Sequence, residues 1–146
     1  MTHTHDKHTI DKQLLEQKQQ AYMEIQMINQ QLKQHAEQLQ RVDEKIGEIT
    51  TLLEALDGIK TTGPMMATIG GGVFLNAELK NAESVYVNVG SNIIVKKKIP
   101  EVKTMLLRQN QELEQYKAQL LIQAENMQEQ IKNIQEVLQQ GPGKQR

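Results

Sequence analysis

The residues best suited to chemistry in this sequence are its histidines. His3, His5 and His8 are close enough to ligate a metal ion, but their neighbours are polar, so a flexible tail is favoured. His35 falls on the apolar stripe of a helical pattern, where a polar residue that sets helix register is favoured over a ligand or a base. The chain has no cysteine, which excludes a thiol nucleophile and a Cys-ligated metal. We therefore predict no metal site and no cofactor.

Two further motifs match ligand-binding patterns only in part. Gly70-Gly71-Gly72 is not followed by Lys and Ser or Thr, so a tight turn or bulge is favoured over a phosphate loop. Lys96-Lys97-Lys98 lacks interleaved aromatics, which favours a solvated edge strand over a nucleic-acid site. No Ser-His-Asp set, carboxylate pair or HExxH motif falls on a predictable shared surface. The sequence predicts neither an enzyme nor a nucleic-acid-binding protein.

Composition bounds the elements that must position any site. The 146 residues allow one domain or a domain with an appendage, and only 3% are aromatic. Because aromatic residues bury the largest area per residue, we do not expect this chain to bury its apolar surface without a partner. Its net charge of −1 gives no bias toward nucleic acid or anionic membranes. No apolar run is long enough for a membrane span, and we expect a cytoplasmic protein.

Glutamine and charge divide the chain into three parts. Ten of the 21 Gln lie between Gln13 and Gln40 and eleven lie from Gln109 onward, so none falls in the β-branched middle. Residues 58–100 carry five basic and two acidic groups, whereas both flanking parts are acidic. We predict a flexible tail over 1–9, a helix over 10–57, a β insert over 58–100, a helix over 101–140 and a flexible tail over 141–146.

The first predicted helix carries a heptad repeat, which is typical of a left-handed coiled coil. Only two of its thirteen seam positions are not apolar, and Gly58 stands where a C-terminal cap glycine belongs. The seam positions are Leu14, Lys18, Ala21, Ile25, Ile28, Leu32, His35, Leu39, Val42, Ile46, Ile49, Leu53 and Leu56.

The second predicted helix starts at Pro100-Glu101 and continues the repeat, with Gln109 as its one polar member. We place a stutter, meaning two successive steps of four residues, at Tyr116–Leu120–Ala124. The other seam positions are Val102, Leu106, Leu113, Met127, Ile131, Ile134 and Leu138. Two long helices separated by about forty residues that can reverse direction are expected to pair as an antiparallel hairpin.

Four short period-two runs separate the helices, at 65–69, 73–80, 84–89 and 93–99. The breaks between them supply turn residues, so we predict two β hairpins. Val73, Leu75, Ala77 and Leu79 share one strand face, and Val85, Val87 and Val89 point inward. Two-stranded hairpins are marginal alone and leave unpaired edges, so the insert is interpreted as an assembly module.

The segment IGGGVFLNAELKNAESVYVNVGSNIIVKKKI between two heptad helices resembles the β region of prefoldin, specifically its alpha class. The Gly72-Val73-Phe74 step and the Val87-x-Val89-Gly90 step carry the resemblance, whereas residues after Gly90 depart from the usual family pattern. It implies an α+β fold with a long antiparallel two-helix coiled coil, and hairpins that assemble into an oligomeric β-barrel base. The residues assigned to this assembly are Val73, Phe74, Leu75, Val85, Val87, Val89, Ile93 and Val95.

The resemblance also implies an ATP-independent holdase chaperone. Its partners would be beta-class subunits, in a hexamer of two alpha and four beta chains, unfolded client proteins, and a group II chaperonin. Apolar residues outside the seam, such as Met27, fit either client contact or ordinary surface contacts, and the resemblance favours client contact. The residues assigned to the client-binding tips are Ile10, Leu14, Leu15, Tyr22, Met23, Ile131, Ile134, Val137 and Leu138.

Two other function classes stay open. A prefoldin-like scaffold would assemble in a similar way but bind one folded partner. A plain coiled-coil tether would need no β insert, and the insert counts against it.

Overall fold

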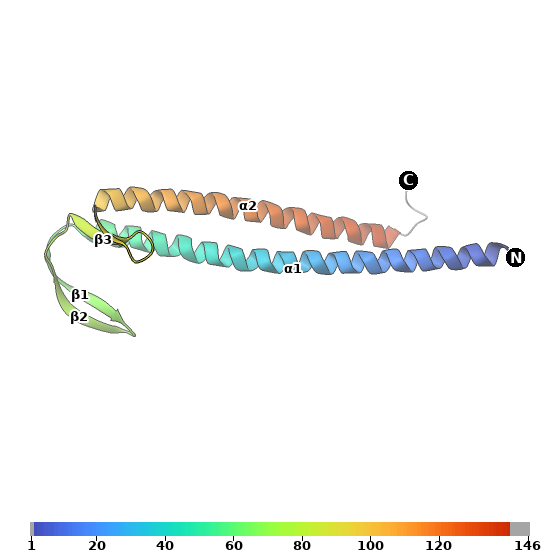
Figure 1. Ribbon diagram of the computed structural model, residues 1–146, viewed down its shortest axis with the longest axis horizontal. Coiled ribbons are helices and arrows are strands. Elements are labelled where there is room, and N and C mark those ends of the chain that lie inside the picture. The colour runs from blue at the N-terminus through green and yellow to red at the C-terminus, as the bar shows by residue number, and fades with distance from the viewer. Residues whose placement is uncertain (1, 141–146) are drawn as a thin grey trace. The chain divides into compact units, whose positions relative to one another are not determined.

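The computed structural model describes the backbone of residues 2–140 and the side chains of residues 7–140. The tail predicted for 141–146 and the side chains of His3 and His5 lie outside the described residues. Within the described part, two β hairpins lie between two long helices in the sequence, which confirms the predicted fold class (Figure 1). The elements are α1 Thr2–Gly58, β1 Gly63–Gly70, β2 Val73–Leu79, β3 Ser84–Asn88, β4 Ile94–Lys98 and α2 Ile99–Gln140.

Helix α1 begins before its heptad repeat and ends where the repeat ends. It starts at Thr2 rather than at Ile10, and residues 2–9 contain neither Pro nor Gly to interrupt its hydrogen-bond ladder. It ends at Gly58, and the Ile59 amide then donates to the Leu56 carbonyl at 3.2 Å. Every seam position named above for α1 is buried or half-buried except Lys18. The heptad reading of the first helix is confirmed.

Helix α2 corrects the predicted seam in its first half. Gln109 and Tyr116 are exposed, whereas Asn110 and Lys117 are half-buried. The two successive four-residue steps therefore lie at Val102–Leu106–Asn110, not at Leu120. The apolar pattern missed this because Asn110 is polar and because a lysine can bury its aliphatic stem while its charge stays in water.

The contacts within the chain divide it into two compact units. The helical unit contains residues 1–42 and 116–146, and the insert unit contains residues 43–115. In the helical unit, the described parts of α1 and α2 lie side by side (Figure 1). Its most buried side chains are Ile28, Val42 and Leu120.

The insert unit contains both hairpins. Hairpin 1 pairs β1 with β2 antiparallel, with a bulge between Thr68 and Gly70, and hairpin 2 pairs β3 with β4 antiparallel. In hairpin 2 the Ile93 amide donates to the Gly90 carbonyl at 2.9 Å across a two-residue turn. Ser91 and Asn92 both have positive φ, 50° and 60°, as the type I′ turn of a twisted hairpin requires.

The core of the insert unit lies between its two helical segments. It consists of Ile49, Leu56, Ile99, Val102 and Leu106, all at most 6% exposed. Among the described strand residues, those packed against this core are Val85 and Val87, both from β3. The Ile99 amide donates to the Glu83 carbonyl at 3.0 Å, which ties the start of α2 to the start of hairpin 2. Hairpin 2 is therefore part of the folded subunit.

Candidate binding and assembly surfaces

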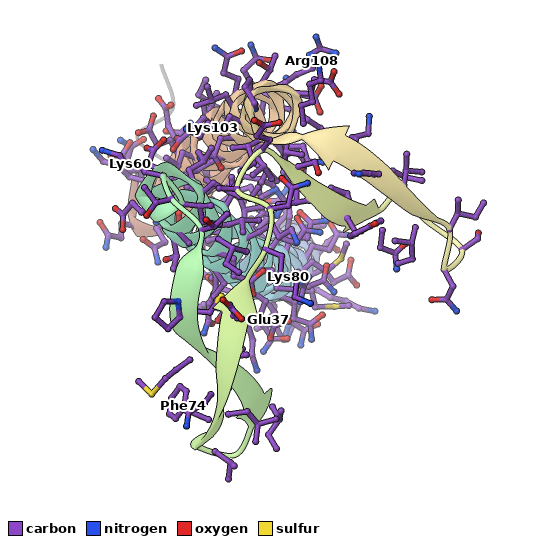
Figure 2. The ribbon with its side chains drawn as sticks, turned by 90° about the vertical axis from the view of Figure 1, so that its left-hand side faces the viewer. Glu37, Lys60, Phe74, Lys80, Lys103 and Arg108 are labelled. Carbon is purple, nitrogen blue, oxygen red and sulfur yellow. The ribbon has the colours of Figure 1, made fainter. Side chains whose placement is uncertain are left out.

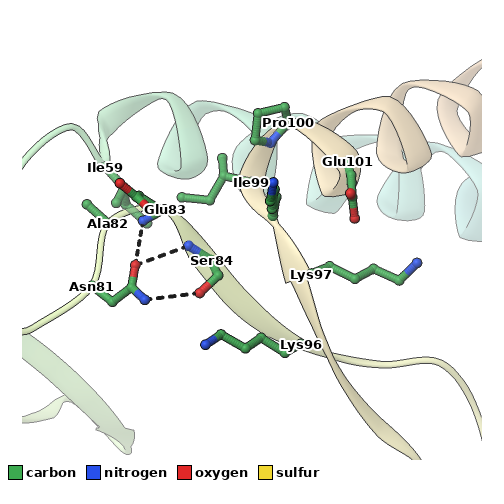
Figure 3. A pocket seen from close by; sticks show the side chains of 11 residues that line it. Ile59, Asn81, Ala82, Glu83, Ser84, Lys96, Lys97, Ile99, Pro100 and Glu101 are labelled. Atoms are coloured by element: carbon green, nitrogen blue, oxygen red, sulfur yellow. Dashed lines mark hydrogen bonds between the residues drawn. The ribbon is translucent and has the colours of Figure 1, made fainter.

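A groove of about 800 Å³ lies where hairpin 2 meets the start of α2. In its lining, Asn81, Glu83 and Ser84 are joined by hydrogen bonds, as Figure 3 shows. The Asn81 Oδ1 accepts from the Glu83 and Ser84 amides at 2.7 and 3.3 Å, and its Nδ2 donates to the Ser84 hydroxyl. Asn81 thus closes the connection between the hairpins by a local Asx-type turn. These bonds hold the connection in place.

The described residues contain no group of three or more His, Asp or Glu placed to bind a metal ion. The glycine run at 70–72 forms the turn of hairpin 1, with φ between 59° and 105°. Backbone of this kind favours glycine, because a Cβ would be strained there. These glycines serve the turn, in agreement with the preference for a tight turn over a phosphate loop.

Large apolar side chains are exposed near the N-terminus of α1 and the C-terminus of α2. Tyr22 and Met23 are 60% and 65% exposed. Met27, for which the resemblance also favours client contact, is 61% exposed. We call the exposed members of the predicted tip residues the tip set: Ile10, Leu15, Tyr22, Met23 and Val137.

The remaining predicted tip residues occupy a different face. Leu14, Ile131, Ile134 and Leu138 are half-buried and fall on the seam of the helical unit. Ile131, Ile134 and Leu138 lie where α1 and α2 run side by side and can pack between the two helices, whereas the residues of the tip set face water. The structure therefore separates the predicted tip residues into a solvent-facing group and a seam group.

The register of the helical unit leaves part of α1 without an α2 segment beside it in the described chain. The His35 imidazole bonds to the Gln123 side chain. Gln140, the last residue of α2, follows Gln123 by 17 residues, and Lys18 precedes His35 by the same number. At equal rise per residue, α1 before Lys18 extends past Gln140. Ile10 and Leu15 lie on this extension.

Hairpin 1 exposes apolar side chains from both of its faces. Val73, Phe74 and Leu75 are 51%, 58% and 52% exposed, so successive residues on opposite faces of β2 all meet water. Figure 2 shows the Phe74 side chain projecting from the hairpin. Sequence reasoning omitted Met65, Met66 and Ile69 of β1, which are 46%, 69% and 65% exposed. The signal for them was available, because cross-strand pairing makes β1 share both faces of β2.

Hairpin 2 is exposed on one face only. Val85, Val87 and Val95 are half-buried on the side that packs toward the helical core, whereas Val89 and Ile93 at the turn are 51% and 58% exposed. The predicted inward direction is thus confirmed for Val85 and Val87 and is wrong for Val89, which lies beyond the end of β3.

The outer face of hairpin 2 holds apolar residues that the sequence reasoning did not select. Tyr86 is 73% exposed and Ile94 is 60% exposed. Tyr86 pairs with Lys96 across the hairpin, which places an aromatic side chain beside the lysine run. Strand alternation puts Tyr86 opposite in direction to its inward neighbours Val85 and Val87, so its exposure was predictable in principle.

None of the described helices is long and apolar enough to cross a membrane.

Comparison with known proteins identifies the family. The prefoldin subunit family model matches residues 28–142. Prefoldin subunit alpha of Methanococcus maripaludis strain C5 is 31% identical over 102 residues, covering 70% of this chain and 71% of its relative. Prefoldin subunit alpha of Methanosphaera stadtmanae is 36% identical over 98 residues, covering 66% of this chain and 68% of its relative.

A solved structure shows the same fold. The cryo-EM structure of filamentous PFD from Methanocaldococcus jannaschii superposes with a TM-score of 0.69 at 16% sequence identity. The match covers 76% of this chain and 94% of that chain. The fold of two helices flanking β hairpins agrees with the family model, which matches most of the chain, and with the alpha-subunit relatives. The chain therefore belongs to the prefoldin family, a family of chaperones.

Proposed function

We propose that this chain is the alpha-class subunit of an ATP-independent holdase that binds unfolded proteins through its helix ends. The observation that carries this proposal is the tip set, whose apolar side chains face water at the end of the helical unit. Apolar residues placed outside a two-helix seam cannot be buried by the partner helix, and Met23 adapts to irregular partners. Family membership supports a chaperone role for these residues.

Assembly would rest on the β hairpins. Hairpin 1 leaves apolar residues uncovered on both faces, and a two-stranded sheet is marginal without further strands. We propose that hairpins of two alpha-class and four beta-class subunits join into a β-barrel base. Val73, Phe74 and Leu75 would be covered there, together with Val89 and Ile93. The inner face of hairpin 2 would contribute to assembly indirectly, by holding this hairpin in place. Its residues are Val85, Val87 and Val95.

Client capture would be weak for each subunit and strong for the assembly. A non-native chain exposes scattered apolar segments, and several tips joined to one base raise the effective concentration of contacts. Such contacts break without nucleotide hydrolysis. A group II chaperonin that binds the same segments would then take over the client in the cytoplasm, and the lack of cysteine is compatible with that reducing compartment.

The test is a light-scattering assay of a diluted, denatured protein mixed with a complex of this chain and a beta-class subunit. The complex should carry shortened beta-class helices, so that protection reports this chain. The double substitution Tyr22→Ser/Met23→Ser should raise the concentration of complex needed for protection about tenfold, because two of the most exposed contacts on each tip are lost. The hexamer should keep its sedimentation coefficient.

A matched control is available on the same unit. Leu121 and Ile122 are 46% and 58% exposed but lie outside the tip set. Leu121→Ser with Ile122→Ser removes similar apolar area, and its complex should protect as well as the unchanged one. Equal protection by the tip variant would contradict the holdase assignment. Binding of one folded protein without protection of unfolded clients would favour the scaffold alternative.

Transfer to a chaperonin can be measured separately. A fluorescent client bound to the complex should move to a group II chaperonin in the absence of ATP, since release is by competition. A client that leaves only after ATP addition would contradict that step, while capture by the tips would be judged by the scattering assay alone.

A further inference from the structure

Strand β4 carries three consecutive lysines, a run of like charge next to the free edge of its sheet. Hairpin 2 contains Lys96, Lys97 and Lys98 and no acidic residue between Ser84 and Lys98. Its sheet has two strands, so one edge of β4 is unpaired within the described residues. An unpaired strand edge presents backbone donors and acceptors to any strand that approaches it.

The cross-strand register separates these lysines into two directions. Lys96 and Lys98 pair with Tyr86 and Ser84 and belong to the outer face, whereas Lys97 pairs with the half-buried Val85. Lys96 and Lys98 are therefore two residues apart on one face, about 7 Å along the strand. A strand added at this edge would place its own outward side chains directly beside both charges.

The outer face is not an ordinary protected edge. Lysines alone are enough to prevent aggregation at a strand edge, and exposed apolar side chains beside them would work against that protection. Here Tyr86 is 73% exposed beside Lys96, and Ile94 on the same face is 60% exposed. Apolar area next to fixed charge is typical of an interface that selects its partner by charge.

A second copy of this chain does not fit that edge. The antiparallel register that pairs all five residues of two β4 strands places Lys96 opposite Lys96. A parallel pairing places all three lysines opposite lysines. Like charges directly opposite destabilise a strand pair, so both arrangements are repelled.

We propose that the β4 edge accepts an acidic strand from a different subunit and rejects a second copy of this chain, so that charge selects mixed assembly. This proposal rests on the hairpin-based assembly proposed above and names the chemistry of the partner. Glu or Asp beside Lys96 and Lys98 would attract, and an apolar residue of the partner would cover Tyr86 and Ile94. Because these charges are exposed, the selection weakens as salt rises.

The experiment uses the chain as its own partner. Wild-type chain and a Lys96→Glu/Lys98→Glu variant carry different N-terminal fluorophores and are sedimented alone and mixed at equal concentration. The mixture should contain at least ten times more co-sedimenting species than either chain alone at 50 mM salt, because opposite edges then meet. The excess should vanish at 1 M salt, where the Debye length is about 3 Å.

Matched variants keep the result interpretable. Lys60→Glu/Lys80→Glu changes the net charge equally but lies outside hairpin 2, and its mixture with wild type should show no excess. Lys96→Gln/Lys98→Gln removes the repulsion without adding attraction, so it should self-associate more than wild type. Far-ultraviolet circular dichroism verifies that each variant retains its helices.

Three results would overturn the proposal. These are a mixture with no excess, an equal excess for the Lys60 and Lys80 variant, or binding of labelled oligothymidylate by wild type without mixed assembly. A chain that joins a beta-class subunit while failing the mixing test would refute charge selection and leave the proposed function intact. A chain that never joins a beta-class subunit would instead refute the proposed assembly.

Discussion

The Nε2 of His35 lies 2.8 Å from the Gln123 Oε1 across the two helices of the helical unit. The Nδ1 of His35 also contacts the Gln31 carbonyl, one turn earlier on its own helix, at 3.1 Å. A backbone carbonyl only accepts, so Nδ1 carries the proton in that bond. The Gln123 amide can present its oxygen or its nitrogen to Nε2, so this bridge is available to both the neutral and the charged imidazole.

This bridge predicts that His35 sets register at the expense of stability. In the His35→Leu variant the free energy of unfolding should rise by about 1 kcal/mol, because an apolar side chain replaces a half-buried polar one on the seam. Register should become less unique. Cysteines at Leu39 and Leu120 should cross-link in wild type, whereas the variant should also cross-link Leu39 to Met127, one heptad away. A variant that cross-links only the first pair would show that His35 does not specify register.

The two hairpins should respond differently to a buried charge. Phe74→Asp lies on hairpin 1, away from the core of the insert unit, so it should abolish assembly and leave the subunit's melting temperature unchanged. Val87→Asp lies on hairpin 2 against that core, so it should abolish assembly and also destabilise the subunit by several kcal/mol. Analytical ultracentrifugation with thermal circular dichroism separates the two effects. A hexamer that survives Phe74→Asp would contradict the assembly role of hairpin 1.

The turn of hairpin 2 can be improved. Asn92 has φ of 60°, a conformation that glycine adopts without the strain of a Cβ. Asn92→Gly should therefore stabilise the hairpin by about 0.5 kcal/mol. Slower hydrogen exchange of the Val89 and Ile93 amides, which bond across this turn, would report the gain.

Gly71→Ala supplies the opposite case. Gly71 has φ of 59°. A Cβ added there would contact no neighbouring atom, but the backbone conformation would be strained. Hairpin 1 should lose about 1 kcal/mol, seen as faster exchange of the β1 and β2 amides. Unchanged exchange would mean that the Gly70–Gly72 turn tolerates side chains.

Gly47 offers a test of helix propensity without packing. It lies inside α1, and a Cβ added at Gly47 would meet nothing within 4 Å. Gly47→Ala should therefore stabilise the chain by about 1 kcal/mol, because alanine loses less backbone entropy in a helix. Urea unfolding measures this change, and a loss of stability would show that Gly47 serves a contact in the assembled protein.

Asn110 should be replaceable with a gain in stability. Its Oδ1 is buried and makes no hydrogen bond to the described residues. Asn110→Leu removes that unpaired oxygen from the seam and should raise the free energy of unfolding by about 1–2 kcal/mol. Destabilisation would indicate that the Asn110 oxygen is satisfied in the native assembly.

The sequence by itself determined the two helices and the existence of the hairpins. Both are local properties, since a 3.5-residue apolar period defines a seam and a two-residue period bounded by turn residues defines a strand pair. Every α1 seam position except Lys18 accordingly lies at least half-buried. The resemblance to prefoldin could also be recognised from a short segment of the insert, and the family match confirms it.

Tertiary structure alone decided which residues of these elements meet one another. The seam of α2 passes through Asn110 and Lys117, because the pairing of two whole helices outweighs the preference of single polar residues for water. Tyr86 stands beside Lys96 because a turn between them fixes the hairpin register, a relation that no local periodicity encodes. Only hairpin 2 rests on the helical core, since Val85 and Val87 reach side chains more than ten positions away in the chain. Contacts of that range depend on how the backbone folds. They decide which predicted tip residues face water and which lie on the seam, and which strand faces are covered.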